Sequence, residues 1–257
     1  MAVFVKVRSP MITINPNKAS LTTTQLEALK PLSSCVLSDA LDVVLGRLSP
    51  AEQPVHIGGC LPGGIQEIRH YDTPMIGTAT TIYAPNGTSL PLHLAMATHA
   101  QDHILIISID ECTNVAYMGD IQALLSARNH CAGIVIDGYI RDRQGIAELD
   151  MPVFSRGSLP KRPTKEELGG INVPIKIGDT HIDPGDIIFG DTDGVVIIPA
   201  TLLALVIDEA IKKEESDNNR KNKVAQFNFA NAHTTLDYID IMTKDVADFV
   251  KTNQDKL

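Results

Sequence analysis

The stretch Met118–Arg143, with the sequence MGDIQALLSARNHCAGIVIDGYIRDR, decides the fold class of this chain. After the Gly-Asp pair at 119–120, residues Ile121–Asn129 predict a helix. The apolar run GIVI at 133–136 is typical of a strand that is covered on both faces. A helix followed directly by a buried strand predicts one unit of an α/β layer.

The preceding segments show the same alternation of strands and helices. Gly77–Ala84 is rich in β-branched residues and Ile104–Ile109 is a nearly continuous apolar run, so both predict strands. Leu90–Ala100 between them predicts a helix, and apolar residues near helical spacing predict another helix over Ser33–Leu45. Four short strands are expected further along the chain, at 152–155, 173–177, 187–189 and 195–198.

One α/β domain with a helical C-terminal extension accounts for these elements better than two domains. The chain has 257 residues, domains usually hold about 100–200 residues, and no internal repeat or low-complexity tract divides the sequence. From Ala200 the composition predicts helices to Leu257, with a break near Asp217–Asn219. We therefore expect a leader at 1–32, the α/β domain at 33–215 and the extension at 216–257.

Composition and charge exclude several classes of partner. Lys plus Arg total 22 and Asp plus Glu total 31, a formal net charge of -9, which argues against a nucleic-acid-binding protein. No apolar run approaches the roughly 18–20 residues of a membrane span, and we expect no signal peptide in Met1–Pro10. Because no cysteines form a CxxC pair, we expect a cytoplasmic protein with buried, reduced thiols. The cysteines are Cys35, Cys60, Cys112 and Cys131.

The common nucleotide-binding and hydrolase motifs are absent from the sequence. There is no GxGxxG after a strand, no P-loop and no GxSxG nucleophile elbow. His93, His99 and His103 lie close together, but only the last two share the four-residue step of a helix face, so we expect structural roles for them. The charge run Lys212–Glu215 predicts a solvated helix face.

Polar residues at two points of the opening stretch can meet at one edge of the predicted sheet. Asp120 lies where an N-cap would begin the helix, and the N–H groups of residues 119–122 would form an anion site there. Arg141 and Asp142 lie just past the carboxyl end of the strand that runs into Asp137-Gly138, the edge where ligands bind in open α/β sheets. Spacing alone supports two interpretations equally: a ligand cleft, or surface charges with a helix cap.

Five sequence blocks resemble those of the RraA-like family, and this resemblance favours the cleft. Asp120, twenty residues and then Arg141-Asp142 is similar to the family's D-x20-R-D signature. The other blocks occur in the family's order, and the match spans roughly residues 33–215. They are SDALD at 38–42, GTATT at 77–81, PVFSRG at 152–157, and PGD at 184–186 through GDTDGVV at 190–196 to Pro199.

The resemblance implies a swivelling β/β/α fold that assembles as a homotrimer or homohexamer with active sites between subunits. It implies a divalent cation, Mg²⁺ or Mn²⁺, on Asp142, a contact from Arg141 to the 2-oxo group of the substrate, and a metal-bound water oriented by Asp120. It also implies that a glutamate of a neighbouring subunit reaches the site, for which Glu214 and Glu215 are the candidates. The substrate carboxylate would be held by the backbone amides of Met118, Gly119, Asp120, Ile121 and Gln122.

The family includes metal-dependent 4-hydroxy-4-methyl-2-oxoglutarate/4-carboxy-4-hydroxy-2-oxoadipate aldolases. The implied function is therefore a class II pyruvate aldolase or oxaloacetate decarboxylase-like lyase, which cleaves a small 2-oxo acid through a pyruvate enolate and needs no Schiff-base lysine. The alternative is a regulator like RraA itself, which binds and inhibits an RNA-degrading enzyme without catalysis. The helical tail resembles the longer aldolase branch, and the particular 2-oxo acid stays open.

Overall fold

The computed structural model describes residues 12–110 and 114–253; Cys112 and residues 1–11 of the predicted leader lie outside them. Within the described residues, the backbone forms one eleven-stranded sheet and a separate hairpin of two strands. The strands are β1 (Ile12–Ile14), β2 (Gly59–Cys60), β3 (Gln66–Glu67), β4 (Met75–Tyr83), β5 (His103–Ser108), β6 (Ala116–Met118), β7 (Gly133–Ile140), β8 (Val153–Ser158), β9 (Gly169–Ile171), β12 (Ile187–Asp191) and β13 (Gly194–Ile198), with β10 (Ile175–Ile177) and β11 (Thr180–Ile182) in the hairpin. The main sheet has the order β2-β13-β12-β4-β5-β7-β8-β3, and β1, β6 and β9 pair beside this path.

Strands β4, β5, β7 and β8 run parallel and form the buried centre of the sheet. Every residue of β5 is buried, and its alternate side chains enter different cores, as the two-residue period of a strand requires. Leu105 and Ile107 pack in the core that includes α-helical residues, whereas Ile104 and Ile106 pack with the hairpin and the antiparallel strands. The prediction of a strand covered on both faces is therefore confirmed.

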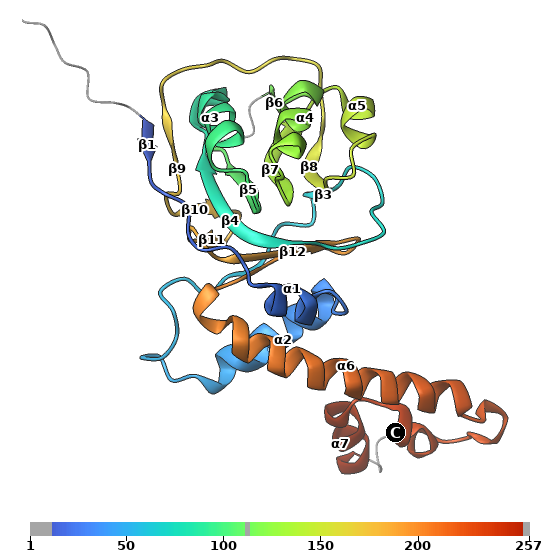
Figure 1. Ribbon diagram of the computed structural model, residues 1–257. Coiled ribbons are helices and arrows are strands. Elements are labelled where there is room, and N and C mark those ends of the chain that lie inside the picture. Colours follow the sequence, from blue (N-terminus) through green and yellow to red (C-terminus); the bar gives the residue numbers. More distant parts are fainter. Residues whose placement is uncertain (1–11, 111–113, 254–257) are drawn as a thin grey trace, which may run out of the picture.

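Helices cover the sheet in two groups, which Figure 1 shows above and below it. Leu92, Ala123 and Ile146, from three successive helices, belong to the core over the parallel strands. Leu37 and Val206, from two others, pack with the antiparallel strands β12 and β13. The α-helices are α1 (Thr23–Leu29), α2 (Ser34–Arg47), α3 (Leu90–Thr98), α4 (Asp120–Arg128), α5 (Arg143–Ala147), α6 (Leu203–Gln226) and α7 (Lys244–Thr252), and the short 3-10 helices are η1 (Pro85–Gly87), η2 (Ala200–Leu202), η3 (Phe229–Asn231) and η4 (Thr235–Ile241).

The C-terminal residues form a helical arm that projects from the body of the molecule (Figure 1). Its main element, α6, runs without interruption for 24 residues, so the predicted break near Asp217–Asn219 is wrong. Ion pairs from Asp217 to Lys213 and Arg220, four and three residues away, support the helix across this point. The division of the chain at residue 215 thus falls inside α6, and it stays a proposal.

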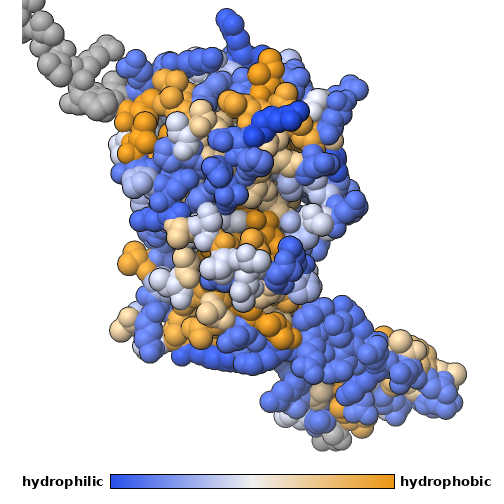
Figure 2. Space-filling view, viewed as in Figure 1, coloured by the Kyte–Doolittle hydropathy of each residue, from blue (hydrophilic) through white to orange (hydrophobic). Residues whose placement is uncertain are grey.

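The surface differs between the body and the arm. Figure 2 shows hydrophobic residues on the body, both at the end that carries α3 and α4 and at the end next to the arm, whereas the arm is mostly hydrophilic on this face. Cys131 is buried, but Cys35 and Cys60 are exposed, so the prediction of buried thiols is wrong for these two. Among the described residues, no helix is both long and apolar enough to cross a bilayer.

Candidate active site

The N-terminus of α4 begins one residue earlier than predicted. Gly119 is the N-cap and Asp120 is the first helical residue, because the side chain of Gln122 accepts the Gly119 N–H at 3.0 Å. Asp120 Oδ1 accepts the Ile121 N–H at 2.7 Å. Of the four N–H groups of residues 119–122 that we expected to face an anion, those of Gly119 and Ile121 therefore already donate to side chains of the chain itself.

The carboxyl end of β7 carries Arg141 and Asp142, as predicted. The strand does not stop at residue 136 but continues to Ile140, with a register irregularity before Tyr139. The Arg141 N–H donates to the carbonyl of Met118 at 2.8 Å. This bond ties the end of β7 to β6, which leads directly into α4.

The Arg141-Asp142 end of the predicted signature lies against Gly119, the residue that precedes Asp120. Asp142 has a left-handed backbone with φ of 55° at the N-cap position of α5, and its Oδ2 lies 3.3 Å from Nε of Arg141. A Cβ atom on Gly119 would lie only 2.6 Å from Asp142 Oδ2 and 3.2 Å from Arg141 Nε. Because no side chain fits there, the glycine N-cap allows Arg141 and Asp142 to approach the start of α4.

A cleft of about 780 Å³ opens at this edge of the sheet. Among the predicted substrate-binding residues, those that line it are Met118, Gly119, Gln122 and Arg141. Asp120, Ile121 and Asp142 do not line it; the exposed side chain of Ile121 is 74% accessible. The structure thus brings the predicted backbone segment and the guanidinium into one cleft, with the two carboxylates beside it.

The sequence reasoning missed one wall of this cleft, which the loop after β8 provides. Lys161, Arg162 and Lys165 line the cleft from this loop. The loop is held in place because the Ala116 N–H donates to the Lys161 carbonyl at 2.8 Å and the Ser89 N–H donates to the Thr164 carbonyl at 3.0 Å. Together with Arg141, the loop gives the cleft a cationic lining that suits an anionic ligand.

His93 also lines the cleft, and its structural role stays a prediction. Its Nδ1 lies 2.9 Å from the carbonyl oxygen of Ser89. A carbonyl can only accept, so this nitrogen carries the proton and the neutral ring has an unprotonated Nε2. His99 and His103 instead contact backbone carbonyls of the N-terminal segment, which agrees with structural roles.

A half-buried ion pair supports the strands beneath the site. Arg156 Nε donates to Asp137 Oδ1 at 2.6 Å, which gives the PVFSRG block a structural purpose. Burial raises the pKa of Asp137, and the neighbouring Arg156 partly offsets that rise. The pair therefore fixes β7 against β8 just before the strand reaches Arg141.

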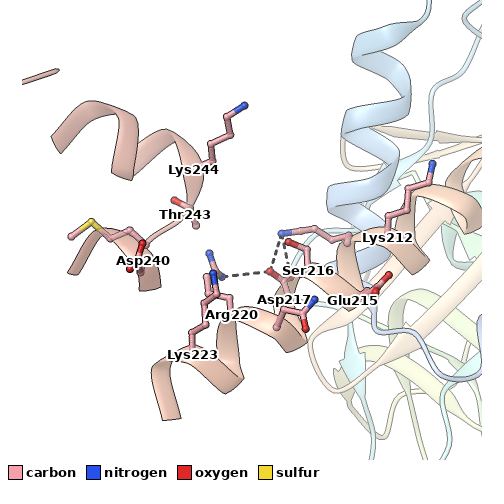
Figure 3. Close-up of a pocket in the computed structure, with 12 residues that line it drawn as sticks. Lys212, Glu215, Ser216, Asp217, Arg220, Lys223, Asp240, Thr243 and Lys244 are labelled. Atoms are coloured by element: carbon pink, nitrogen blue, oxygen red, sulfur yellow. Dashed lines mark hydrogen bonds and ion pairs between the residues drawn. The ribbon is translucent and has the colours of Figure 1, made fainter. Parts of the chain in front are cut away.

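The arm carries a second groove, of about 560 Å³, between α6 and α7 (Figure 3). Its basic residues include Lys212, Arg220 and Lys244. Glu215 lines this groove, and Glu214 accepts a hydrogen bond from Asn218 at 3.2 Å on the same helix. Neither glutamate lines the Arg141 cleft of its own chain, so a role for them in catalysis requires a neighbouring subunit.

The candidate metal ligand suits a cation that keeps most of its waters. Among residues 12–110 and 114–253, no cluster of three or more His, Cys, Asp or Glu side chains could enclose a metal ion. The Asp142 side chain is 46% exposed, and its Oδ2 faces the Arg141 guanidinium. Mg²⁺ usually takes one or two carboxylates together with water and substrate oxygens. Asp142 therefore fits a water-retaining cation and not an all-protein cage.

The fold and the site together define an α/β protein with a cationic cleft at the carboxyl edge of its parallel strands. Residues 34–197 match the family model described as RraA-like: Aldolase/RraA. The chain therefore belongs to the RraA-like family. A protein of Halalkalibacterium halodurans named "Putative 4-hydroxy-4-methyl-2-oxoglutarate aldolase" is 34% identical over 152 residues, which are 59% of this chain and 72% of that protein.

Two solved structures confirm the predicted fold. Streptomyces coelicolor RraAS2, titled an unusual member of the RNase ES inhibitor RraA protein family, superimposes with a TM-score of 0.66 at 20% identity and covers 81% of this chain and 100% of its own. The RNA-processing inhibitor RraA from Thermus thermophilis gives a TM-score of 0.53 at 20% identity over 63% of this chain and 92% of its own. At this identity the likeness concerns the fold alone, which is the RraA-like α/β fold with an added helical arm.

Proposed function

We propose that this protein is a divalent-metal-dependent lyase that cleaves a 2-oxo dicarboxylic acid, such as 4-hydroxy-4-methyl-2-oxoglutarate or oxaloacetate, through a pyruvate enolate. The observation that carries the proposal is the single cleft that joins Arg141, the start of α4 and the basic loop. The name of the relative from Halalkalibacterium halodurans supports the aldolase class.

Arg141 has the central electrostatic role in this proposal. Breaking the carbon–carbon bond moves negative charge onto the C2 oxygen of the substrate, and a permanently charged guanidinium stabilises that oxygen more as the charge grows. The start of α4 would bind the adjacent carboxylate through its free amides and its dipole. Lys161 and Arg162 would bind the second carboxylate, which favours dicarboxylic over monocarboxylic substrates.

Asp142 would hold the divalent cation. When bound, Mg²⁺ or Mn²⁺ acts as a Lewis acid toward the 2-oxo acid. Asp120, whose Oδ1 is fixed by the Ile121 N–H, would orient the water that takes the proton from the C4 hydroxyl when the carbon–carbon bond of an aldol substrate is cleaved. No lysine is required to form a Schiff base in this scheme.

A second function is favoured by the solved neighbours that are titled as RraA inhibitors. A regulator of that kind binds an RNA-degrading enzyme and has no activity of its own. One assay separates the two functions: release of pyruvate from 4-hydroxy-4-methyl-2-oxoglutarate and from oxaloacetate, with Mg²⁺ or Mn²⁺ and then with EDTA. Metal-dependent release supports the lyase, and no release from either substrate contradicts it.

We also propose that the protein is a homotrimer or homohexamer. Ile121, Leu124 and Leu125 of α4 are large apolar residues that are 74%, 46% and 45% exposed beside the candidate site, and such a patch marks an interaction surface. A contact there would let Glu214 or Glu215 of a neighbouring subunit reach the cleft. Light scattering would test this assembly, and a mass close to that of one subunit would rule it out.

A further inference from the structure

Asp120 and Asp142 each pack against a glycine that lies near the other aspartate in the sequence. Asp142, at the start of α5, lies against Gly119 at the start of α4. Asp120, at the start of α4, lies against Gly145 of α5: a Cβ atom on Gly145 would be 3.0 Å from Asp120 Cβ and 3.0 Å from Asp120 Oδ2. Figure 1 shows α4 and α5 side by side on the same face of the sheet.

Helix formation gives no reason for a glycine at position 145. Gly145 lies in the middle of the five-residue helix α5, where glycine costs about 0.5–1 kcal/mol relative to alanine. Its φ is not positive, so an alanine could adopt the same backbone conformation. Gly46 of α2 makes a useful contrast, since nothing lies within 4 Å of a Cβ placed there. At Gly145, by contrast, an added Cβ would lie so close to Asp120 that Asp120 or α5 would have to shift by a few tenths of an ångström.

We propose that Gly145 is a positioning residue that sets the place of Asp120 relative to Asp142. An added methyl group would press on Asp120 Cβ, which is fixed to the backbone of α4, and on its carboxylate, which can rotate. Rotation would weaken the 2.7 Å bond from the Ile121 N–H to Asp120 Oδ1. If α5 moved away from α4 instead, Asp142 would move with it, because Asp142 is the N-cap of that helix. Either response changes the spacing of the two carboxylates.

The consequence for turnover rests on the proposed lyase function, whereas the packing itself does not. Gly145→Ala is compared with the matched control Gly46→Ala, in the full chain. We expect Gly145→Ala to lower kcat by about tenfold, as small displacements of reacting groups do, while KM stays within about twofold. The Ile121 amide should exchange its hydrogen about tenfold faster in Gly145→Ala. Gly46→Ala should change neither quantity more than about twofold.

A double-mutant cycle separates positioning from a general loss of structure. If Gly145 acts through Asp120, then Gly145→Ala should lower kcat less in an Asp120→Ala background than in the wild type. Equal losses in both backgrounds, or unchanged Ile121 exchange, would overturn the proposal. A wild-type chain that releases no pyruvate would refute the lyase function alone, and the amide exchange of Ile121 would then decide the positioning role by itself.

Discussion

Two clefts with basic side chains, both within residues 12–110 and 114–253, are built in different ways. The cleft at the sheet edge takes Arg141 from the end of β7 and Lys161 from the loop after β8. The groove on the arm takes Lys212, Arg220 and Lys223 from α6 and Lys244 from the start of α7. Residues that converge from several elements on a rigid sheet can hold a ligand in a fixed geometry. The basic residues of the arm lie on exposed helices, which is typical of a solvated face.

Both regions place a carboxylate beside their cations. In the arm, Asp217 pairs with Lys213 at 3.2 Å and with Arg220 at 3.5 Å, and Figure 3 draws the pair with Arg220 as a dashed line. In the cleft, Arg141 lies 3.3 Å from Asp142. The side chains of Arg141, Lys213 and Arg220 all keep more than a third of their surface exposed. The comparison teaches that neither the number of basic residues nor their ion pairs identify the ligand site; the elements from which they come do.

The strongest test of this difference replaces one arginine from each region. Arg141→Ala should lower kcat/KM for 4-hydroxy-4-methyl-2-oxoglutarate by about 1,000-fold or more, because it removes the charge that stabilises the C2 oxygen. Arg220→Ala should keep kcat/KM within about twofold. Steady-state pyruvate release measures both. Near-normal kcat in Arg141→Ala would contradict the proposed chemistry, and an equal loss in Arg220→Ala would contradict the separation of the two regions.

Removal of the metal should have the next largest effect, and it should depend on Asp142. EDTA is expected to lower wild-type pyruvate release by about 100-fold, since a Lewis acid contributes several kcal/mol to such reactions. Asp142→Ala should have a similarly low activity that no longer responds to added Mg²⁺ or Mn²⁺. Asp240→Ala, in the arm groove, serves as the control and should keep the full metal response. An Asp142→Ala protein that Mg²⁺ still activates would place the metal elsewhere.

Lysine replacements test whether the basic loop selects dicarboxylates. Lys161→Ala should raise KM for 4-hydroxy-4-methyl-2-oxoglutarate by about tenfold, the effect of losing one charge-assisted hydrogen bond. Inhibition by pyruvate, which has one carboxylate, should change less than about twofold. Lys244→Ala on the arm should alter neither constant. If Lys161→Ala weakened pyruvate to the same extent, the loop would bind the carboxylate next to the 2-oxo group instead.

Local sequence patterns predicted the part of the site that lies within one helix–strand unit. Gly119 and Arg141 meet because β6, α4 and β7 are consecutive, so their order alone brings the helix start to the strand end. The one-residue error at the N-cap had a readable signal, since Gln122 stands three residues after Gly119 and accepts its N–H. The uninterrupted α6 had a readable signal too, since Lys213 and Arg220 stand four and three residues from Asp217, and their ion pairs offset the low helix propensity at Asp217–Asn219.

The basic loop could not be placed from sequence, for a physical reason. Lys161 and Arg162 reach the cleft because backbone bonds join Thr164 to Gly87 and Ser89, more than seventy residues earlier. Such pairing leaves no periodicity or spacing in the sequence. His93 could not be placed in the cleft for the same reason, since its neighbours there come from the distant loop and not from the adjacent histidines.

The smallest expected effect concerns the arm itself. Asp217→Ala removes the ion pairs to Lys213 and Arg220, whose side chains are 36% and 39% exposed. Pairs of this kind contribute about 0–1 kcal/mol, and alanine recovers part of that through its higher helix propensity. The melting temperature should therefore fall by no more than a few degrees at low salt, and the difference should shrink in 1 M NaCl because salt screens exposed charges. Turnover should stay within about twofold. A tenfold loss of kcat at an unchanged melting temperature would contradict this expectation and would show that Asp217 itself acts on the active site of a neighbouring subunit.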